Sequence, residues 1–366
     1  MKIIIAPDSF KASISSLKIC QVLKSSLLKV IPEAEILTIP VSDGGEGFLE
    51  ALSAALKLDI VTLNLSDPRG KIIKSEYGIH ENTAYLEMAR AAGLQLLEDH
   101  EKNPLNTTTY GLGEMVLDAI NRGINKFVMG IGGSATNDGG AGMAQALGFQ
   151  FIDRYGKTIT AKMTGKLLGK VASIKAPILP LVNLKVACDV WNPLLGEKGT
   201  VYTYAKQKGA EEDDLPILEN NLRHLNQLFH HDLCRKIENI PGTGAAGGLG
   251  GGLMAFLDAQ LVSGSNLVMD TINFDEKIKN ADIIITGEGQ YDSQTSQGKI
   301  VSEILNRAEK NNVPVYGIFG RMEGPGNEIF NKSVQLVDFA TSEETLKYPV
   351  KYLKRAVNQL FKDFTH

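Results

Sequence analysis

The sequence predicts an α/β protein, and two observations favour this fold class. Apolar, β-branched runs occupy residues 2–7 and 35–40, and patterns with helical spacing follow both of them. The same alternation of strand-like and helical segments returns from about residue 281 to the end of the chain. Short runs of this kind are typical of inner strands in a parallel sheet that is covered by helices on both faces.

The individual elements follow from these patterns. Ser13 or Ser15 is expected to cap a first helix, whose apolar residues extend to Leu28. Further helices are expected at residues 48–56, 211–237, 302–311 and about 349–364. The remaining strand-like segments are residues 59–80 (two strands joined by a turn), 83–89, 125–133, 184–190, 281–289, 313–320 and 333–340.

The whole chain has 366 residues, a length that suggests two domains. Its middle third has a more mixed pattern than the two ends. The simplest architecture is a discontinuous, Rossmann-like domain with a parallel sheet, formed by residues 1–62 and 270–366. A second, mixed α/β domain, residues 63–269, is inserted into it.

Composition excludes several classes of protein. The net charge is −4 and the basic residues do not cluster, so neither nucleic acid nor an anionic membrane is an expected partner. No apolar run of about 18 residues is present. The three cysteines, Cys20, Cys188 and Cys234, are far apart and form no CxxC motif, which favours a reducing, cytoplasmic location.

Polar, glycine-bearing stretches follow several of the predicted strands, at residues 7–13, 42–47, 130–142 and 286–299. Ligands of α/β proteins bind beyond the carboxyl ends of the strands. The stretch GIGGSATNDGGAG (130–142) combines glycines with hydroxyl side chains before a helix expected from about Gly142, which is the pattern of a phosphate-binding loop. Tight turns and close packing are the alternative explanation for its glycines.

Two other functional classes stay open at this point. GTGAAG (242–247) matches the GxGxxG pattern of dinucleotide-dependent oxidoreductases, but no strand is expected before it. The longer glycine-rich run at 241–253 is instead expected to pack the start of a helix against another backbone segment. A metabolite or nucleotide sensor without catalytic activity is the other alternative. A Walker A motif is absent from the sequence.

Eight motifs, in order over residues 1–340, together resemble the bacterial glycerate kinase family, type I. They are APDSFKAS, VSDGGEG, NPLNTTTYGLGE, GIGGSATNDGGAGMAQALG, CDVWNPLLGEKG, QKGA, PGTGAAGGLGGGL and TGEGQYDSQTSQGK. The resemblance implies transfer of the γ-phosphoryl group of ATP, with Mg²⁺, to D-glycerate. The expected product is 2-phosphoglycerate, as for a glycerate 2-kinase, with 3-phosphoglycerate as the alternative. It also implies an active site between two domains. The expected assembly is a monomer or a homodimer.

Site residues are expected in the loops that carry these motifs. Asp189 is the expected proton acceptor or Mg²⁺ ligand, Lys11 is expected to neutralise negative charge, and Asp43 is a second candidate for the metal. Capping of the next helix is an alternative role for Asp43 and Glu46. The substrate-binding candidates are Asp8, Ser9, Asp43, Glu46, Glu288 and Asp292, and those for the ATP phosphates are Gly132, Gly133, Ser134, Thr136, Asn137 and Asp138.

Some positions depart from the family pattern. Gln290 stands where the family usually has an arginine, so this chain needs another cation if that arginine binds an anionic group. Arg321, in a loop that also departs from the pattern, is a candidate replacement. Arg69 occupies a position that is usually apolar.

Overall fold

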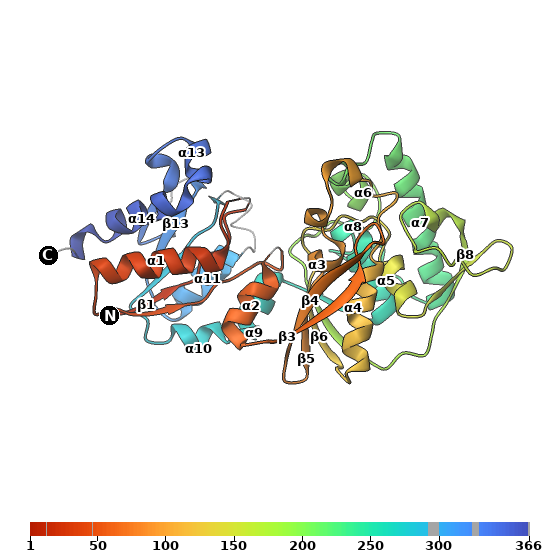
Figure 1. Cartoon of the computed structure of the whole chain (residues 1–366), viewed down its shortest axis with the longest axis horizontal. Coiled ribbons are helices and arrows are strands. Elements are labelled where there is room, and N and C mark those ends of the chain that lie inside the picture. The colour runs from red at the N-terminus through yellow and green to blue at the C-terminus, as the bar shows by residue number, and fades with distance from the viewer. Residues whose placement is uncertain (12, 46, 292–299, 324–328, 365–366) are drawn as a thin grey trace. The chain divides into compact units, whose positions relative to one another are not determined.

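The chain divides into two compact units, both of the α/β class (Figure 1). The computed structural model describes residues 1–11, 13–45, 47–291, 300–323 and 329–364. The first unit contains Met1–Asp43, Gly47–Leu58 and Ser263–His366, and the second contains Gly44–Glu46 and Asp59–Val262. The predicted fold class, a parallel-sheet α/β unit interrupted by a mixed α/β unit, is therefore confirmed.

A five-stranded parallel sheet forms the centre of the first unit, with the strand order β15-β13-β11-β1-β2. One of its inner strands, β1, contains Ile3, Ile4 and Ile5, which are completely buried, as expected for a strand covered on both faces. The chain passes from β1 to β2 in one direction and from β11 through β13 to β15 in the other, so the strand order reverses between β1 and β11. The strands are β1 (Lys2–Ile5), β2 (Glu35–Thr38), β11 (Ile283–Thr286), β13 (Val315–Phe319) and β15 (Lys332–Gln335).

Two long helices of this unit, α1 and α14, lie side by side (Figure 1) and pack with Ile3 and Ile5 in one apolar core. Ser15 caps α1 by accepting a hydrogen bond from the amide of Lys18. The last helix ends at Leu360, four residues before the predicted end, and a 3₁₀ turn (Lys362–Phe364) follows it. The helices are α1 (Ser16–Val30), α2 (Phe48–Leu56), α9 (Gly264–Thr271), α10 (Phe274–Ile278), α11 (Ile300–Lys310), α13 (Ser342–Lys347) and α14 (Pro349–Leu360).

The second unit contains a mixed six-stranded sheet with the order β10-β9-β6-β5-β4-β3. Four neighbouring strands, from β10 to β5, are parallel, and their last residues, Val262, Ala187, Gly130 and Glu87, stand in register. The loops that follow these strands therefore leave the sheet at one edge. The strands are β3 (Asp59–Ser66), β4 (Ile72–His80), β5 (Thr83–Glu87), β6 (Lys126–Gly130), β9 (Asn183–Ala187) and β10 (Gln260–Val262), with β7 (Gln150–Asp153) and β8 (Val171–Lys175) forming a separate antiparallel pair.

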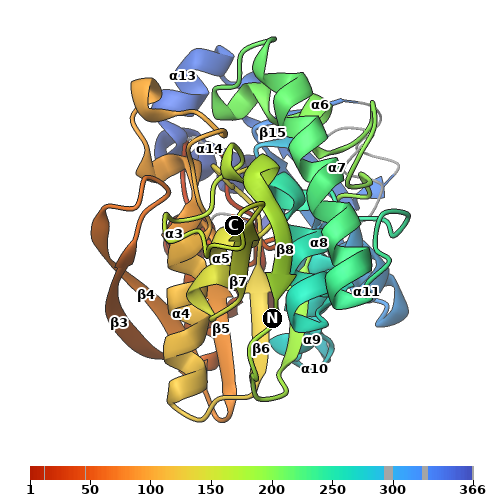
Figure 2. The same cartoon turned by 90° about the vertical axis from the view of Figure 1, so that its right-hand side faces the viewer.

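Helices and an aromatic cluster complete this unit. Figure 2 shows α4 beside α5. The Phe256 ring packs edge-to-face against those of Phe149 and Phe229, with centroids 4.9 and 5.1 Å away. The helices are α3 (Ala89–Ala92), α4 (Tyr110–Asn121), α5 (Ala141–Ala146), α6 (Thr200–Tyr204), α7 (Asp214–Leu233) and α8 (Ala245–Leu257). Within the ranges that the structure describes, no helix is long and apolar enough to cross a lipid bilayer.

The glycine-rich run at 241–253 brings α8 into close contact with the 130–142 loop, as its composition predicts. A Cβ atom on Gly247 would lie 1.9 Å from the carbonyl oxygen of Thr136, and one on Gly252 would lie 2.1 Å from that of Gly139. Gly247 also has a φ of +74°, which favours glycine. The preceding segment is a turn and not a strand, so the GTGAAG match lacks the strand–loop–helix context of a dinucleotide-binding site.

Asp138 is a buried carboxylate that connects two helix N-termini. It accepts hydrogen bonds from the amide and hydroxyl of Thr109, both at 2.8 Å, and from the amides of Gly142 at 3.1 Å and Gly140 at 3.2 Å. Thr109 precedes α4, and Gly140 precedes α5. Burial raises the pKa of the Asp138 carboxyl, and these four donors oppose the shift. The 130–142 loop is therefore held from inside by charge-assisted hydrogen bonds.

Replacing this carboxylate should destabilise the second unit. Asp138→Ala leaves several buried donors without an acceptor, so we expect the free energy of unfolding to fall by at least about 2 kcal/mol. The measurement is equilibrium denaturation in urea. Asp153→Ala is the matched control, because Asp153 also accepts two amide hydrogen bonds but lies in a less buried turn. Equal, small losses in both variants would contradict this role of Asp138.

Candidate active site

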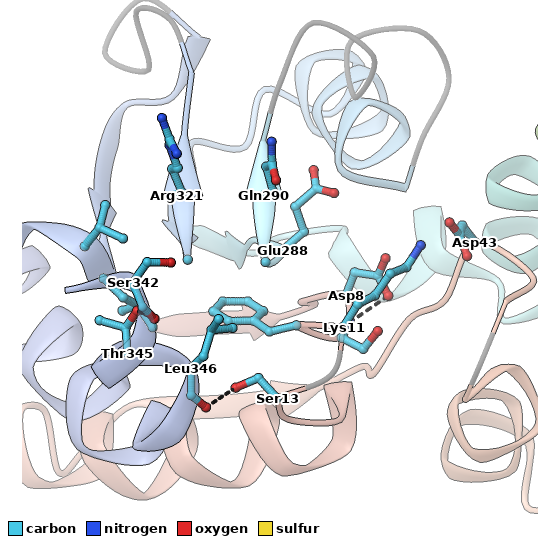
Figure 3. A pocket seen from close by; sticks show the side chains of 16 residues that line it. Asp8, Lys11, Ser13, Asp43, Glu288, Gln290, Arg321, Ser342, Thr345 and Leu346 are labelled. Atoms are coloured by element: carbon cyan, nitrogen blue, oxygen red, sulfur yellow. Dashed lines mark hydrogen bonds between the residues drawn. The ribbon is translucent and has the colours of Figure 1, made fainter. Parts of the chain in front are cut away.

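A cavity of about 420 Å³ lies at the carboxyl ends of the strands in the first unit (Figure 3). Asp8 follows β1, Glu288 follows β11 and Arg321 follows β13, and all three line it. It thus includes the position where the strand order reverses, which is where open α/β sheets bind ligands. Lys11 and Asp43 also line the cavity.

The electrostatics of this cavity centre on Asp8, whose side chain is only 7% exposed. Burial raises its pKa well above the ordinary value, and the negative charges of Asp43 and Glu288 raise it further. The amide of Ser9, 2.7 Å from Oδ1, and the ammonium of Lys11 oppose this shift. The site therefore favours ligands that bring hydroxyl donors or positive charge to its carboxylates.

The structure brings together most of the substrate-binding residues that the sequence predicts. Asp8, Ser9, Asp43 and Glu288 all line the cavity, as does Lys11. Glu46 and Asp292 lie outside the described residues, so their predicted roles stay predictions. Gly47 occupies the N-cap position of α2 and has no side chain to cap it, and the capping alternative for Asp43 and Glu46 stays a prediction.

The glycine-rich loop after β6 has an exposed part and an interior part. Gly132 is half-buried and Gly133 is exposed, whereas Thr136, Asn137 and Asp138 are completely buried and Ser134 is 6% exposed. The amide of Gly132 donates to the carbonyl of Gly44 at 3.2 Å. Only the first half of the predicted phosphate-binding loop is therefore open to solvent.

Asp189 lies two residues beyond β9, the strand next to β6 in the sheet. Its side chain is half-buried and its Oδ2 atom is shielded from solvent. Burial raises the pKa of the neighbouring Cys188 thiol, and the Asp189 charge contributes to this shift. Asp189 and the exposed glycines therefore follow adjacent parallel strands at the same edge of the second sheet.

Lys208 contacts the predicted phosphate-binding loop, and the sequence analysis did not identify this contact. Its ammonium group donates to Ser134 Oγ at 2.6 Å and to the carbonyl of Thr136 at 2.8 Å, and the side chain is 2% exposed. Burial lowers its pKa to about 7, although the charge of Asp138 acts in the opposite direction. This residue lies 74 positions from Ser134, in a short 3₁₀ helix (Lys206–Lys208), so no local spacing indicated the contact.

Glu87 is a second residue that was missed. It ends β5 at the same edge of the sheet as Gly130 and Ala187, and it is 3% exposed. Its Oε2 atom lies 3.4 Å from the Arg90 guanidinium. The sequence offers one signal for Glu87: it is a carboxylate at the last position of an otherwise largely apolar strand.

The predicted Mg²⁺ ligands, Asp189 and Asp43, belong to the second and the first unit, respectively. The described residues contain no group of three or more His, Cys, Asp or Glu side chains that could hold a metal ion. Mg²⁺ commonly takes only one or two carboxylates, together with water and substrate phosphates. A single carboxylate such as Asp189 is compatible with that chemistry.

Glycine-bearing loops and carboxylates at the carboxyl ends of parallel strands define an α/β enzyme that acts on small polar molecules. The glycerate kinase family model matches residues 3–365. The chain therefore belongs to the glycerate kinase family, and it is a kinase.

Two relatives and one solved structure show how close the similarity is. The chain is 43% identical to a glycerate kinase of Halalkalibacterium halodurans, over 89% of this chain and 87% of that protein. It is 41% identical to glycerate 2-kinase of Escherichia coli K12, over 88% and 86% of the two chains. A crystal structure from Salmonella typhimurium LT2, described as a glycerate kinase 2, matches with a TM-score of 0.87 and 36% identity, over 99% and 98% of the two chains.

The buried ammonium of Lys208 should make stability depend on pH. Its pKa of about 7 in the folded protein is below the 10.5 of a free lysine, so the unfolded chain binds more protons between these values. The free energy of unfolding of the wild type should therefore rise relative to Lys208→Met from about pH 7 to about pH 9, by up to roughly 1.4 kcal/mol per pH unit.

Urea denaturation at about pH 6, 7, 8 and 9 measures this difference. Lys206→Met is the control, because the Lys206 side chain is exposed and pairs with Glu212 at the surface. Its difference from the wild type should change little over the same range. Parallel curves for the wild type and Lys208→Met would contradict the burial of a titrating ammonium group.

Proposed function

We propose that this protein transfers the γ-phosphoryl group of ATP to D-glycerate, with Mg²⁺, and releases 2-phosphoglycerate. Membership of the glycerate kinase family and 41% identity to a glycerate 2-kinase support the substrate and the product. The observation that carries the proposal is the cavity of the first unit, which combines three carboxylates with Lys11 and Arg321.

The chemistry of D-glycerate complements this cavity. The substrate has two hydroxyl groups and one carboxylate, so it offers hydrogen-bond donors to carboxylate side chains and a negative charge to cations. In the proposal, Asp8, Asp43 and Glu288 accept hydrogen bonds from the hydroxyls, and Ser9 contributes a polar contact. Glu46 and Asp292 belong to the same proposed set. Lys11 neutralises negative charge on the reactants.

The phosphates of ATP are assigned to the glycine-rich loop of the second unit. Direct contact is proposed for the backbone amide of Gly133, an exposed residue, and for the hydroxyl of Ser134. Gly132, whose amide donates to the carbonyl of Gly44, is proposed to let the backbone approach the phosphates closely. Thr136, Asn137 and Asp138 are buried and are assigned to the support of this loop. Lys208 holds Ser134 Oγ from the interior, which leaves the Ser134 hydroxyl hydrogen available to a phosphate oxygen.

In the proposed reaction, a hydroxyl oxygen of D-glycerate attacks the γ-phosphorus. A new oxygen–phosphorus bond forms, the bond between the γ-phosphorus and the oxygen of the leaving ADP breaks, and the hydroxyl proton passes to a carboxylate. Asp189 is proposed either as this proton acceptor or as a ligand of Mg²⁺, with Asp43 as the other metal candidate. When bound, Mg²⁺ would stabilise negative charge on the phosphates.

The first test is activity. Release of ADP should require both D-glycerate and Mg²⁺, and ³¹P NMR of the product should show 2-phosphoglycerate. NAD(P)⁺ in place of ATP serves as the control for the oxidoreductase alternative. Folded protein that binds D-glycerate or ATP without any phosphoryl transfer would favour a sensor. If the product is 3-phosphoglycerate, the assignment of the phosphorylated hydroxyl group is wrong.

A second test concerns Asp189. Asp189→Asn keeps the size of the side chain but removes its charge, so kcat should fall by at least about 10²-fold. An unchanged Mg²⁺ requirement would identify a proton acceptor, and a higher Mg²⁺ concentration at half-maximal rate would identify a metal ligand. Asp258→Asn, in an exposed ion pair with Arg235, is the control. Near-normal kcat in Asp189→Asn would exclude both roles.

A further inference from the structure

Gln290 and Arg321 are direct neighbours across two short parallel strands, β12 (Gln290–Tyr291) and β14 (Arg321–Met322). Paired residues in adjacent strands project their side chains to the same face of a sheet. Figure 3 shows the two side chains next to each other, and both residues line the cavity of the first unit. An arginine at position 290 or at position 321 would therefore lie at the same side of this cavity.

Backbone contacts fix the position of Arg321. Its amide donates a hydrogen bond to the carbonyl oxygen of Gly289 at 3.0 Å. The amide of Gly320 donates to the carbonyl oxygen of Glu288, also at 3.0 Å. The strands approach so closely that a Cβ atom on Gly320 would lie 2.3 Å from the Gly289 oxygen. The strand pair therefore holds the Cα atom of Arg321 at a defined place beside Glu288.

The guanidinium group of Arg321, in contrast, is only weakly held by the protein. The side chain is 64% exposed, and the carboxylate of Glu323, itself 54% exposed, lies 3.9 Å away. An exposed ion pair at this distance contributes little to stability. An anionic ligand can therefore recruit this guanidinium without breaking a strong interaction recorded among the described residues.

The charge balance of the cavity gives Arg321 a role. Asp8, Asp43 and Glu288 bring three carboxyl groups to the cavity, and among the described residues that line it the cations are Lys11 and Arg321. The charge of Lys11 already acts on Asp8. An arginine binds a carboxylate through two parallel hydrogen bonds, which gives both charge and orientation.

We propose that Arg321 binds the carboxylate of the hydroxy-acid substrate and thereby orients its hydroxyl groups toward the acidic side of the cavity. This inference rests on the proposed function, because it takes D-glycerate as the substrate. According to this inference, Arg321 makes the site bind a hydroxy acid more tightly than a neutral polyol such as glycerol.

The strand register supplies a sharp test. Neighbouring strands lie about 4.8 Å apart, a distance that the long side chain of arginine can span. Arg321→Gln should lower the affinity for D-glycerate by about 10- to 100-fold, because a charge-assisted hydrogen bond is lost. The exchanged double variant, Gln290→Arg with Arg321→Gln, moves the charge by one strand and should restore the affinity to within about threefold of the wild type.

Affinity is measured by calorimetric titration with D-glycerate without nucleotide, and KM for D-glycerate and for ATP is measured alongside. The KM for ATP should stay within about twofold in both variants. Glu323→Gln is the matched control: it removes the carboxylate beside Arg321, so D-glycerate should bind equally or more tightly. Glycerol, which lacks the carboxylate, should bind equally weakly to the wild type and to Arg321→Gln.

The outcomes separate this inference from the proposed function. Unchanged D-glycerate affinity in Arg321→Gln, or no D-glycerate binding by the wild type, would overturn it. A higher KM for ATP with unchanged D-glycerate affinity would assign Arg321 to a phosphate instead and would overturn it too. Wild-type protein that binds D-glycerate through Arg321 but transfers no phosphoryl group would refute the proposed function and support the inference. Equal melting temperatures of the variants confirm that each is folded.

Discussion

Parallel hydrogen bonding between neighbouring strands is the constraint on which both units depend. In the first unit, β1 pairs with β2 on one side and with β11 on the other, so the loops after all three strands leave the sheet at one edge. In the second unit, the common register of β5, β6, β9 and β10 has the same effect. Residues far apart in the sequence, such as Asp8 and Glu288, come together because their strands end together.

Buried charge has a different role from exposed charge in this protein. Asp138 and Lys208 are buried and hold the glycine-rich loop from inside through hydrogen bonds to its backbone and hydroxyl groups. Lys11 and Arg321 are exposed at a cavity and have few internal partners among the described residues. Because a buried ion with satisfied partners is rigid, the first pair suits support, and the second suits contact with a ligand.

Local patterns in the sequence were sufficient to predict most strands and the α/β class, and the helix at Phe48–Leu56 has the predicted bounds. The helix expected at 211–237 is shorter, Asp214–Leu233, because Cys234 takes a left-handed conformation that ends it. Contacts over long separations could not be predicted in this way. Lys208 and the register of Gln290 with Arg321 depend on how distant segments pack, whereas the glycines and carboxylates after strands were visible as loop composition.

The discontinuity of the first unit delays the completion of its sheet during synthesis. Thr286 hydrogen-bonds to Ala6, 280 residues earlier, beside the paired strands β1 and β11. At about 5–20 residues per second, synthesis of that length takes roughly 14–56 s. The second unit is nearly continuous in sequence and is complete before β11 is made. During this interval the three isoleucines of β1 lack β11, one of the two strands that flank them in the folded sheet.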